Sequence, residues 1–143
     1  MLIVLVMILL SGMIFYVVTD YFEESPLSYG PLPFPVQTPV VKPGGTVLVD
    51  IRRCNSDVET RYYVVTRKLK SVDGHRDIAL PSYSQSMDPG CETLTGLPVA
   101  IPSYACGRYV DTGISYIEGR RKHFAIAWAS EPFEVLCPLA TAP

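Results

Sequence analysis

The sequence predicts an all-β fold, an immunoglobulin-like β-sandwich of about seven strands behind an N-terminal apolar helix and a proline-rich linker. Three observations carry this prediction. Residues 1–18 are almost entirely apolar, residues 21–43 are rich in proline, and the rest alternates apolar and polar residues with period two. The predicted units are a helix of transmembrane type (1–19), the linker with the first strand region (20–43), the sandwich (36–137) and a C-terminal tail (138–143).

The N-terminal stretch, MLIVLVMILLSGMIFYVV, has the composition of a helix that crosses a membrane. At about 1.5 Å per residue it reaches about 27 Å, against about 30 Å for a hydrocarbon core. It lacks a basic n-region and an A-x-A site, so we expect a retained helix rather than a cleaved signal peptide. The absence of Lys and Arg around it permits an inside N-terminus and an extracytoplasmic C-terminal domain. The residues expected to contact a membrane or an assembly are Leu2, Ile3, Leu5, Ile8, Leu9, Ile14 and Phe15, with Ser11 and Gly12 as a small-residue contact between sister copies.

The segment that follows contains prolines at positions 26, 31, 33, 35, 39 and 43. Proline fixes φ and removes a backbone donor, so the segment is expected to be an extended, semi-rigid spacer. Pro33-Phe34-Pro35 is either a docking segment, with Phe34 as a candidate partner contact, or part of a plain stalk.

The remainder shows short period-two runs separated by Gly and Pro turns, with no helical periodicity. In the last run, KHFAIAWA, the small residues Ala125, Ala127 and Ala129 share one face and the large apolar residues share the other. The polar residues 82–90 are expected to form a loop. The predicted strands are 36–41, 46–51, 61–70, 78–80, 91–101, 108–117 and 122–129, with 131–136 extending or repeating the edge.

The four cysteines, Cys54, Cys91, Cys106 and Cys137, all lie beyond the apolar stretch. An even number in a small extracytoplasmic domain favours two disulfides over the alternatives, a zinc site or free thiols, because no two cysteines are close in sequence. In an immunoglobulin-like strand order, the second strand pairs with the fifth and the sixth with the seventh. This order predicts the pairs Cys54–Cys91 and Cys106–Cys137, one at each end of the sandwich.

No chemistry-bearing motif is present. A net charge of −2 and a pI near 5.6 argue against nucleic-acid binding. His75 and His123 lack a partner at a catalytic or metal-binding spacing, so we expect no catalytic residue, metal, cofactor or small-molecule substrate. The basic run Arg120-Arg121-Lys122 is a candidate contact for an acidic partner or a solvated hairpin tip, and the same holds for Arg52-Arg53 and Arg67-Lys68-Lys70.

The Pro-Gly-Gly-Thr turn into TVLVDIRR, the LPVAIP…GRYVDTGISY run and the closing AWASEPFEV resemble small bacteriophage-encoded proteins that join an N-terminal apolar helix to one immunoglobulin-like domain. The resemblance covers residues 36–136. It implies a non-catalytic structural or binding protein, first of all a virion component of the neck, tail or capsid that is present in multiple copies as a homo-oligomer. The alternative is a single-pass membrane protein that displays the domain in the periplasm or outside the cell for adhesion, receptor masking or envelope-adaptor interactions. Residues 1–18 would accordingly lie in a membrane or in a hydrophobic protein channel.

Overall fold

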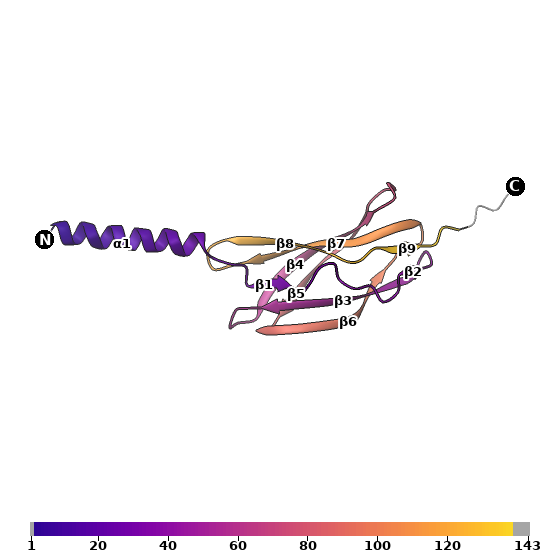
Figure 1. The fold of residues 1–143 in the computed structure, drawn as a ribbon, viewed down its shortest axis with the longest axis horizontal. Coiled ribbons are helices and arrows are strands. Elements are labelled where there is room, and N and C mark those ends of the chain that lie inside the picture. Colours follow the sequence, from indigo (N-terminus) through magenta and orange to yellow (C-terminus); the bar gives the residue numbers. More distant parts are fainter. Residues whose placement is uncertain (1, 139–143) are drawn as a thin grey trace.

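The computed structural model describes residues 2–138, which form one helix followed by nine strands (Figure 1). The helix α1, Leu2–Tyr21, projects from one end of a two-layered β domain, and the last strand lies toward the opposite end (Figure 1). Of the predicted C-terminal tail, 138–143, only Pro138 belongs to the described residues. The strands are β1 Leu27–Tyr29, β2 Val40–Val41, β3 Thr46–Asn55, β4 Arg61–Ser71, β5 Ile78–Met87, β6 Gly90–Ala100, β7 Gly107–Glu118, β8 His123–Ala129 and β9 Phe133–Val135.

The strands form two sheets that enclose a common core. The smaller sheet has the order β1-β3-β6, and the larger has the order β2-β9-β7-β4-β5, with β8 paired to β7 beside this path. Period-two alternation sends every second side chain inward, as along β7, where buried and exposed residues alternate. The core therefore draws buried apolar side chains from both sheets, including Val47, Val49, Val65, Leu69, Val99, Tyr109, Ile117, Trp128 and Phe133.

The predicted fold class, a seven-strand immunoglobulin-like sandwich behind a transmembrane-type helix, is wrong. The structure is a sandwich-like, multi-sheet β fold with nine strands among its described residues. The predicted first strand, 36–41, shrinks to β2, which pairs in parallel with β9 at the margin of the larger sheet. The predicted loop 82–90 is largely strand β5, because Tyr83, Gln85 and Met87 turn inward between exposed serines. The prediction failed here because serine is common in turns and loops, so the serines between the inward residues indicated a loop.

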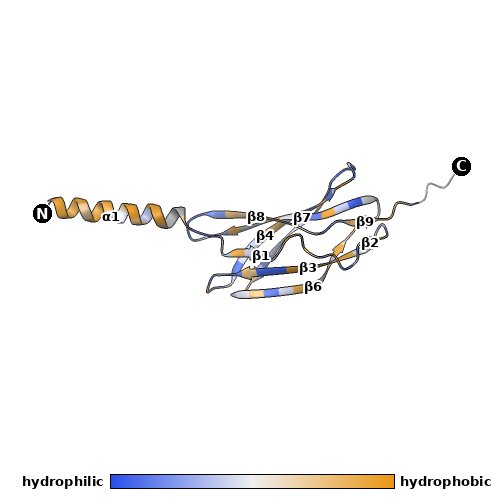
Figure 2. Ribbon diagram, viewed as in Figure 1, coloured by the Kyte–Doolittle hydropathy of each residue, from blue (hydrophilic) through white to orange (hydrophobic). Residues whose placement is uncertain are grey.

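The transmembrane-type helix is also corrected. In the part of the chain that the structure describes, no helix combines the length and the apolar character that crossing a membrane requires. Figure 2 shows apolar character along most of α1.

The proline-rich segment is part of the β domain rather than a spacer. Strand β1 lies within it and pairs antiparallel with β3, placing Leu27 opposite Asn55. Phe34, a candidate partner contact in the sequence prediction, is only 1 % exposed. Its ring lies 5.7 Å from that of Tyr29 and 5.9 Å from that of Trp128, centroid to centroid. The prolines keep the segment extended, and this extension allows Phe34 to reach the core.

The structure contains the disulfides Cys54–Cys91 and Cys106–Cys137. Strand β3 pairs with β6, which brings Cys54 directly opposite Cys91 within the ladder. Cys106 precedes β7 and Cys137 follows β9, and these two strands also pair. Each predicted cysteine pair thus follows from strand pairing, although the Cys54–Cys91 pair lies inside two strands rather than beyond their ends.

Candidate assembly site

The most unusual surface of the protein is the helix α1. Every described apolar side chain from Ile3 to Val18 is at least 45 % exposed, although a water-soluble surface helix normally has one polar face. Of the seven predicted contact residues, the side chain of Leu2 lies outside the described ones. The other six, Ile3, Leu5, Ile8, Leu9, Ile14 and Phe15, belong to this exposed set. A helix that is apolar on all sides is stable only when other apolar groups cover it.

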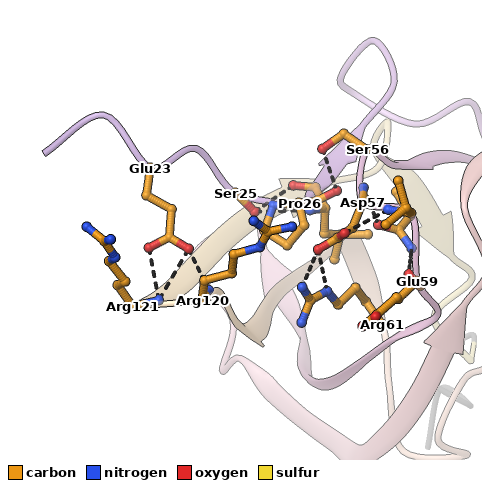
Figure 3. Close-up of polar contacts among 12 residues, drawn as sticks. Glu23, Ser25, Pro26, Ser56, Asp57, Glu59, Arg61, Arg120 and Arg121 are labelled. Carbon is orange, nitrogen blue, oxygen red and sulfur yellow. Dashed lines mark hydrogen bonds and ion pairs between the residues drawn. The ribbon is translucent and has the colours of Figure 1, made fainter. Parts of the chain in front are cut away.

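The connection between α1 and the β domain is built around Glu23. Its carboxylate oxygen Oε1 accepts a hydrogen bond from the backbone N–H of Arg120, and Oε2 accepts one from the N–H of Arg121 at 3.1 Å (Figure 3). Both donors belong to the turn between β7 and β8. Gly119 opens this turn, and a Cβ atom there would lie 2.6 Å from Glu23 Oε1. Only glycine gives the carboxylate room to approach the turn this closely.

The side chain of Arg121 contacts the helix itself. Its Nη1 lies 3.3 Å from the carbonyl oxygen of Tyr16, and its guanidinium group lies 4.7 Å from the centre of the Tyr16 ring. Contacts of this kind, a hydrogen bond together with a cation over an aromatic face, hold α1 to the turn at a second point. We call Tyr16, Glu23, Arg120 and Arg121 the helix junction.

A polar loop after β3 contacts the segment that runs from the helix junction into β1 (Figure 3). The backbone N–H of Ser56 donates to the carbonyl oxygen of Pro26 at 2.8 Å. Arg61 Nε donates to Asp57 Oδ2 at 2.9 Å, and the same two side chains form an ion pair. The hydrogen bond from Arg61, with a further one from the backbone of Val58, holds the pKa of Asp57 below its usual value. The loop is thereby fixed where the chain enters β1.

Two arginines that the sequence suggested as surface contacts lie inside the domain instead. Arg67 forms a buried ion pair with Asp111, whose side chain is fully inaccessible, and lies 5.5 Å from the ring of Trp128. Burial raises the pKa of Asp111, and Arg67 opposes that increase. Arg53 Nη1 donates to Gln85 Oε1 at 2.6 Å, and its Nε donates to Glu92 Oε1 at 2.6 Å. Arg67–Asp111 links neighbouring strands of the larger sheet, whereas the Arg53–Gln85 hydrogen bond joins the smaller sheet to the larger. Neither arginine is available to a partner.

The remaining predicted site residues lie apart from one another. The basic run Arg120-Arg121-Lys122 forms the tip of the β7–β8 hairpin, where two of its backbone amides bind Glu23 and Lys122 Nζ lies 5.3 Å from the Phe124 ring. His123 begins β8, with Nδ1 3.9 Å from Glu118. His75 lies at the far end of the domain beside Gly107. The described residues contain no group of three or more His, Cys, Asp or Glu side chains placed to hold a metal ion.

Sequence reasoning missed Glu23, which is the centre of the helix junction. Its partners follow 97 and 98 residues later, and no local pattern links positions so far apart. The only available signal is the combination of an acidic residue directly after the helix with a glycine-initiated basic turn, whose exposed N–H groups form a site for an anion.

Comparison with known proteins adds a weak structural relationship. No protein-family model matches the chain, and no curated protein sequence does. Its structure is similar to that of Spo0M, a sporulation control protein from Bacillus subtilis, with a TM-score of 0.41 and 11% sequence identity. The matched region covers 80% of this chain, and the chain spans about half, 51%, of the Spo0M chain.

Proposed function

We propose that this protein is a non-catalytic structural subunit that assembles in several copies, with α1 buried among neighbouring subunits. The observation that carries the proposal is the full exposure of an apolar helix on a domain that holds it outward. Burying apolar surface stabilises association by about 25 cal/mol per Å², so a helix of this kind is a strong driving force for assembly. The helix junction fixes the direction in which α1 leaves the β domain, so neighbouring copies meet it in one orientation.

The polar interior supports a structural role. The buried hydroxyl of Ser115 contacts the Tyr29 hydroxyl at 2.5 Å and the indole Nε1 of Trp128 at 3.3 Å. Burial raises the pKa of Tyr29 well above its ordinary value, so this phenol stays protonated and does not act as a base toward Ser115. The arrangement therefore fixes core packing and does not activate a nucleophile.

The test measures the mass of the full-length protein in solution by sedimentation and light scattering. The wild type is expected to form particles of one discrete copy number. Leu9→Glu and Ile14→Glu each place a charge on α1, and we expect both to reduce the mass to that of a single chain. Val72→Glu is the matched control, because Val72 is 49 % exposed but follows β4, away from α1. A heterogeneous mass that grows with concentration, or α1 variants that assemble normally, would contradict the proposal.

We propose that the assembly belongs to a virion, as a component of the neck, tail or capsid surface. The support for this location is the sequence resemblance over residues 36–136. Mass spectrometry of purified particles tests it directly, with the protein expected at a fixed ratio to the major structural proteins. Its absence from purified particles would refute the virion location while leaving the assembly proposal intact.

A further inference from the structure

The larger sheet carries a second apolar surface on its outer face. Strands β4 and β7 pair so that Val64 lies opposite Tyr116, and β7 pairs with β8 so that Tyr116 lies opposite Ala125. Tyr62 is 76 % exposed, Tyr116 47 % and Val64 44 %. We call the six outward side chains Tyr62, Val64, Ile114, Tyr116, Ala125 and Ala127 the outer patch.

The outer patch is partly hollowed. A hollow of about 550 Å³ lies over Tyr62, Val64 and Tyr116, and its lining also includes the charged side chains of Arg61 and Glu118. The small side chains on β8 leave room above that strand, while the tyrosines stand higher on β4 and β7. Tyrosine-rich surfaces with a low charge at their centre are typical of protein–protein interfaces.

The same chain contains a segment that matches this surface, namely α1. Residues 2–18 carry no charged side chain, and neither do the six residues of the outer patch. The helix of 20 residues is about 30 Å long, and the outer patch occupies only residues 114–116 of β7, so the patch can cover a part of the helix and not its whole length. A bundle of sister helices covers only the inward stripe of each helix, so an all-round apolar helix needs a further apolar cover.

The helix junction decides which copy supplies the helix. It holds α1 at the β7–β8 turn, and from there α1 runs away from the domain (Figure 1). A chain's own α1 is therefore directed away from its own outer patch. A neighbouring copy displaced along the long axis of the molecule would bring its α1 toward the exposed face of β4, β7 and β8.

We propose that the outer patch is the docking surface for α1 of a second copy of this chain. The contact is heterologous, because the helix of one copy meets the sheet of the next, which leaves the patch of the first copy and the helix of the second copy unused. Contacts of this type give a discrete copy number when they close into a ring, which is the arrangement that the proposed function requires. The inference rests on the proposed function, since it names the surface that receives the assembling helix.

A crosslinking experiment on the full chain tests the contact. The photoreactive amino acid p-benzoylphenylalanine replaces Tyr116 in unlabelled chains, which are mixed with heavy-isotope chains before irradiation. We expect crosslinked peptides that join position 116 of one isotope class to α1 of the other. The same replacement at Tyr104, which is 75 % exposed and lies outside the outer patch, is expected to give no crosslink to α1. Crosslinks within one isotope class only would overturn the inference.

Charge substitutions give the second arm. Val64→Glu is expected to weaken assembly by about tenfold or more, since it places an unpaired charge in the interface. Val72→Glu is the matched control, because Val72 is 49 % exposed against 44 % for Val64, and it is expected to leave assembly unchanged. Unchanged thermal unfolding verifies that both variants fold. If Val64→Glu assembles normally while Leu9→Glu does not, the outer patch is refuted and the proposed function survives; if Leu9→Glu also assembles normally, both fail.

Discussion

Glu23 and Arg121 are joined across 98 residues of sequence by a hydrogen bond of 3.1 Å from the Arg121 backbone N–H to Glu23 Oε2. The bond links the segment that leaves α1 to the turn between β7 and β8. The side chain of the same arginine lies on Tyr16 of the helix. One residue of the turn thus contacts both the helix and the segment that follows it, so the direction of α1 is coupled to the β domain.

Replacing Glu23 is expected to release the helix without unfolding the domain. In Glu23→Ala the amides of Arg120 and Arg121 lose their acceptor, and hydrogen bonds to a charged group contribute about 1.5–3 kcal/mol at most. Because this site is exposed, we expect a loss of global stability of only about 1 kcal/mol or less. Hydrogen exchange followed by NMR should show faster exchange at these two amides alone. Glu24→Ala, which changes the exposed neighbouring acid, is the control; equal exchange in the two variants would contradict the role of Glu23.

The proline-rich segment is expected to behave as part of the core. Phe34→Ala removes a ring that is packed on Tyr29 and Trp128, and a buried Phe→Ala change costs about 3–5 kcal/mol. Leu32→Ala alters a neighbouring side chain that is 49 % exposed and should cost much less. Urea unfolding under non-reducing conditions measures both. A Phe34→Ala variant as stable as Leu32→Ala would restore the view that the segment is a spacer.

The parts of the fold that can be predicted from the sequence are those determined by residues close together in the chain. Alternation along 46–51 and 108–117 predicts strands because burial of every second side chain leaves a local pattern. Pairing of those strands with their neighbours then places the cysteines in two bridges. The second half of strand β5 was not predicted in this way, because its exposed positions are serines, and serine is also common in loops.

The parts that sequence did not predict depend on contacts between distant segments. Phe34 among prolines resembles a surface motif, and only the positions of Tyr29 and Trp128 make it a core residue. In the sequence, Arg67 looks like a surface cation, as the exposed Lys68 beside it is. In the structure, its guanidinium group is buried in an ion pair with Asp111. In both cases the deciding partner lies in a different strand or segment, and a single sequence contains no measure of that proximity.

The carboxyl group of Asp57 is expected to titrate below its ordinary pKa of 3.8, because Arg61 and the Val58 amide stabilise the charged form. A lowered folded-state pKa means that this stabilisation is present above the unfolded-state pKa and is lost as the pH falls through the folded-state value. NMR titration of the Asp57 carboxyl carbon measures the midpoint. Arg61→Gln should move that midpoint upward, and Asp77, whose pKa is lowered by Lys68 instead, should titrate unchanged in the same variant. An unmoved Asp57 midpoint would show that Arg61 is not the cause.

Removing one partner of the buried Arg67–Asp111 pair is expected to lower the free energy of unfolding strongly, whereas replacing both by apolar residues is expected to lower it little. Arg67→Met leaves a fully buried carboxylate without its cation, and breaking such a pair costs about 3–5 kcal/mol. Burial already raises the pKa of Asp111, and the variant removes the opposing effect of Arg67. A raised folded-state pKa means that the native state binds more protons than the unfolded state, so the stability of Arg67→Met should be highest at acid pH and should fall as the pH rises. The double variant Arg67→Met/Asp111→Leu removes both charges and should regain most of the loss, with a flat pH dependence. Urea unfolding of the wild type and both variants between pH 4 and pH 8 measures these stabilities. A double variant no more stable than Arg67→Met would contradict this expectation, because it would mean that the ion pair itself stabilises the fold.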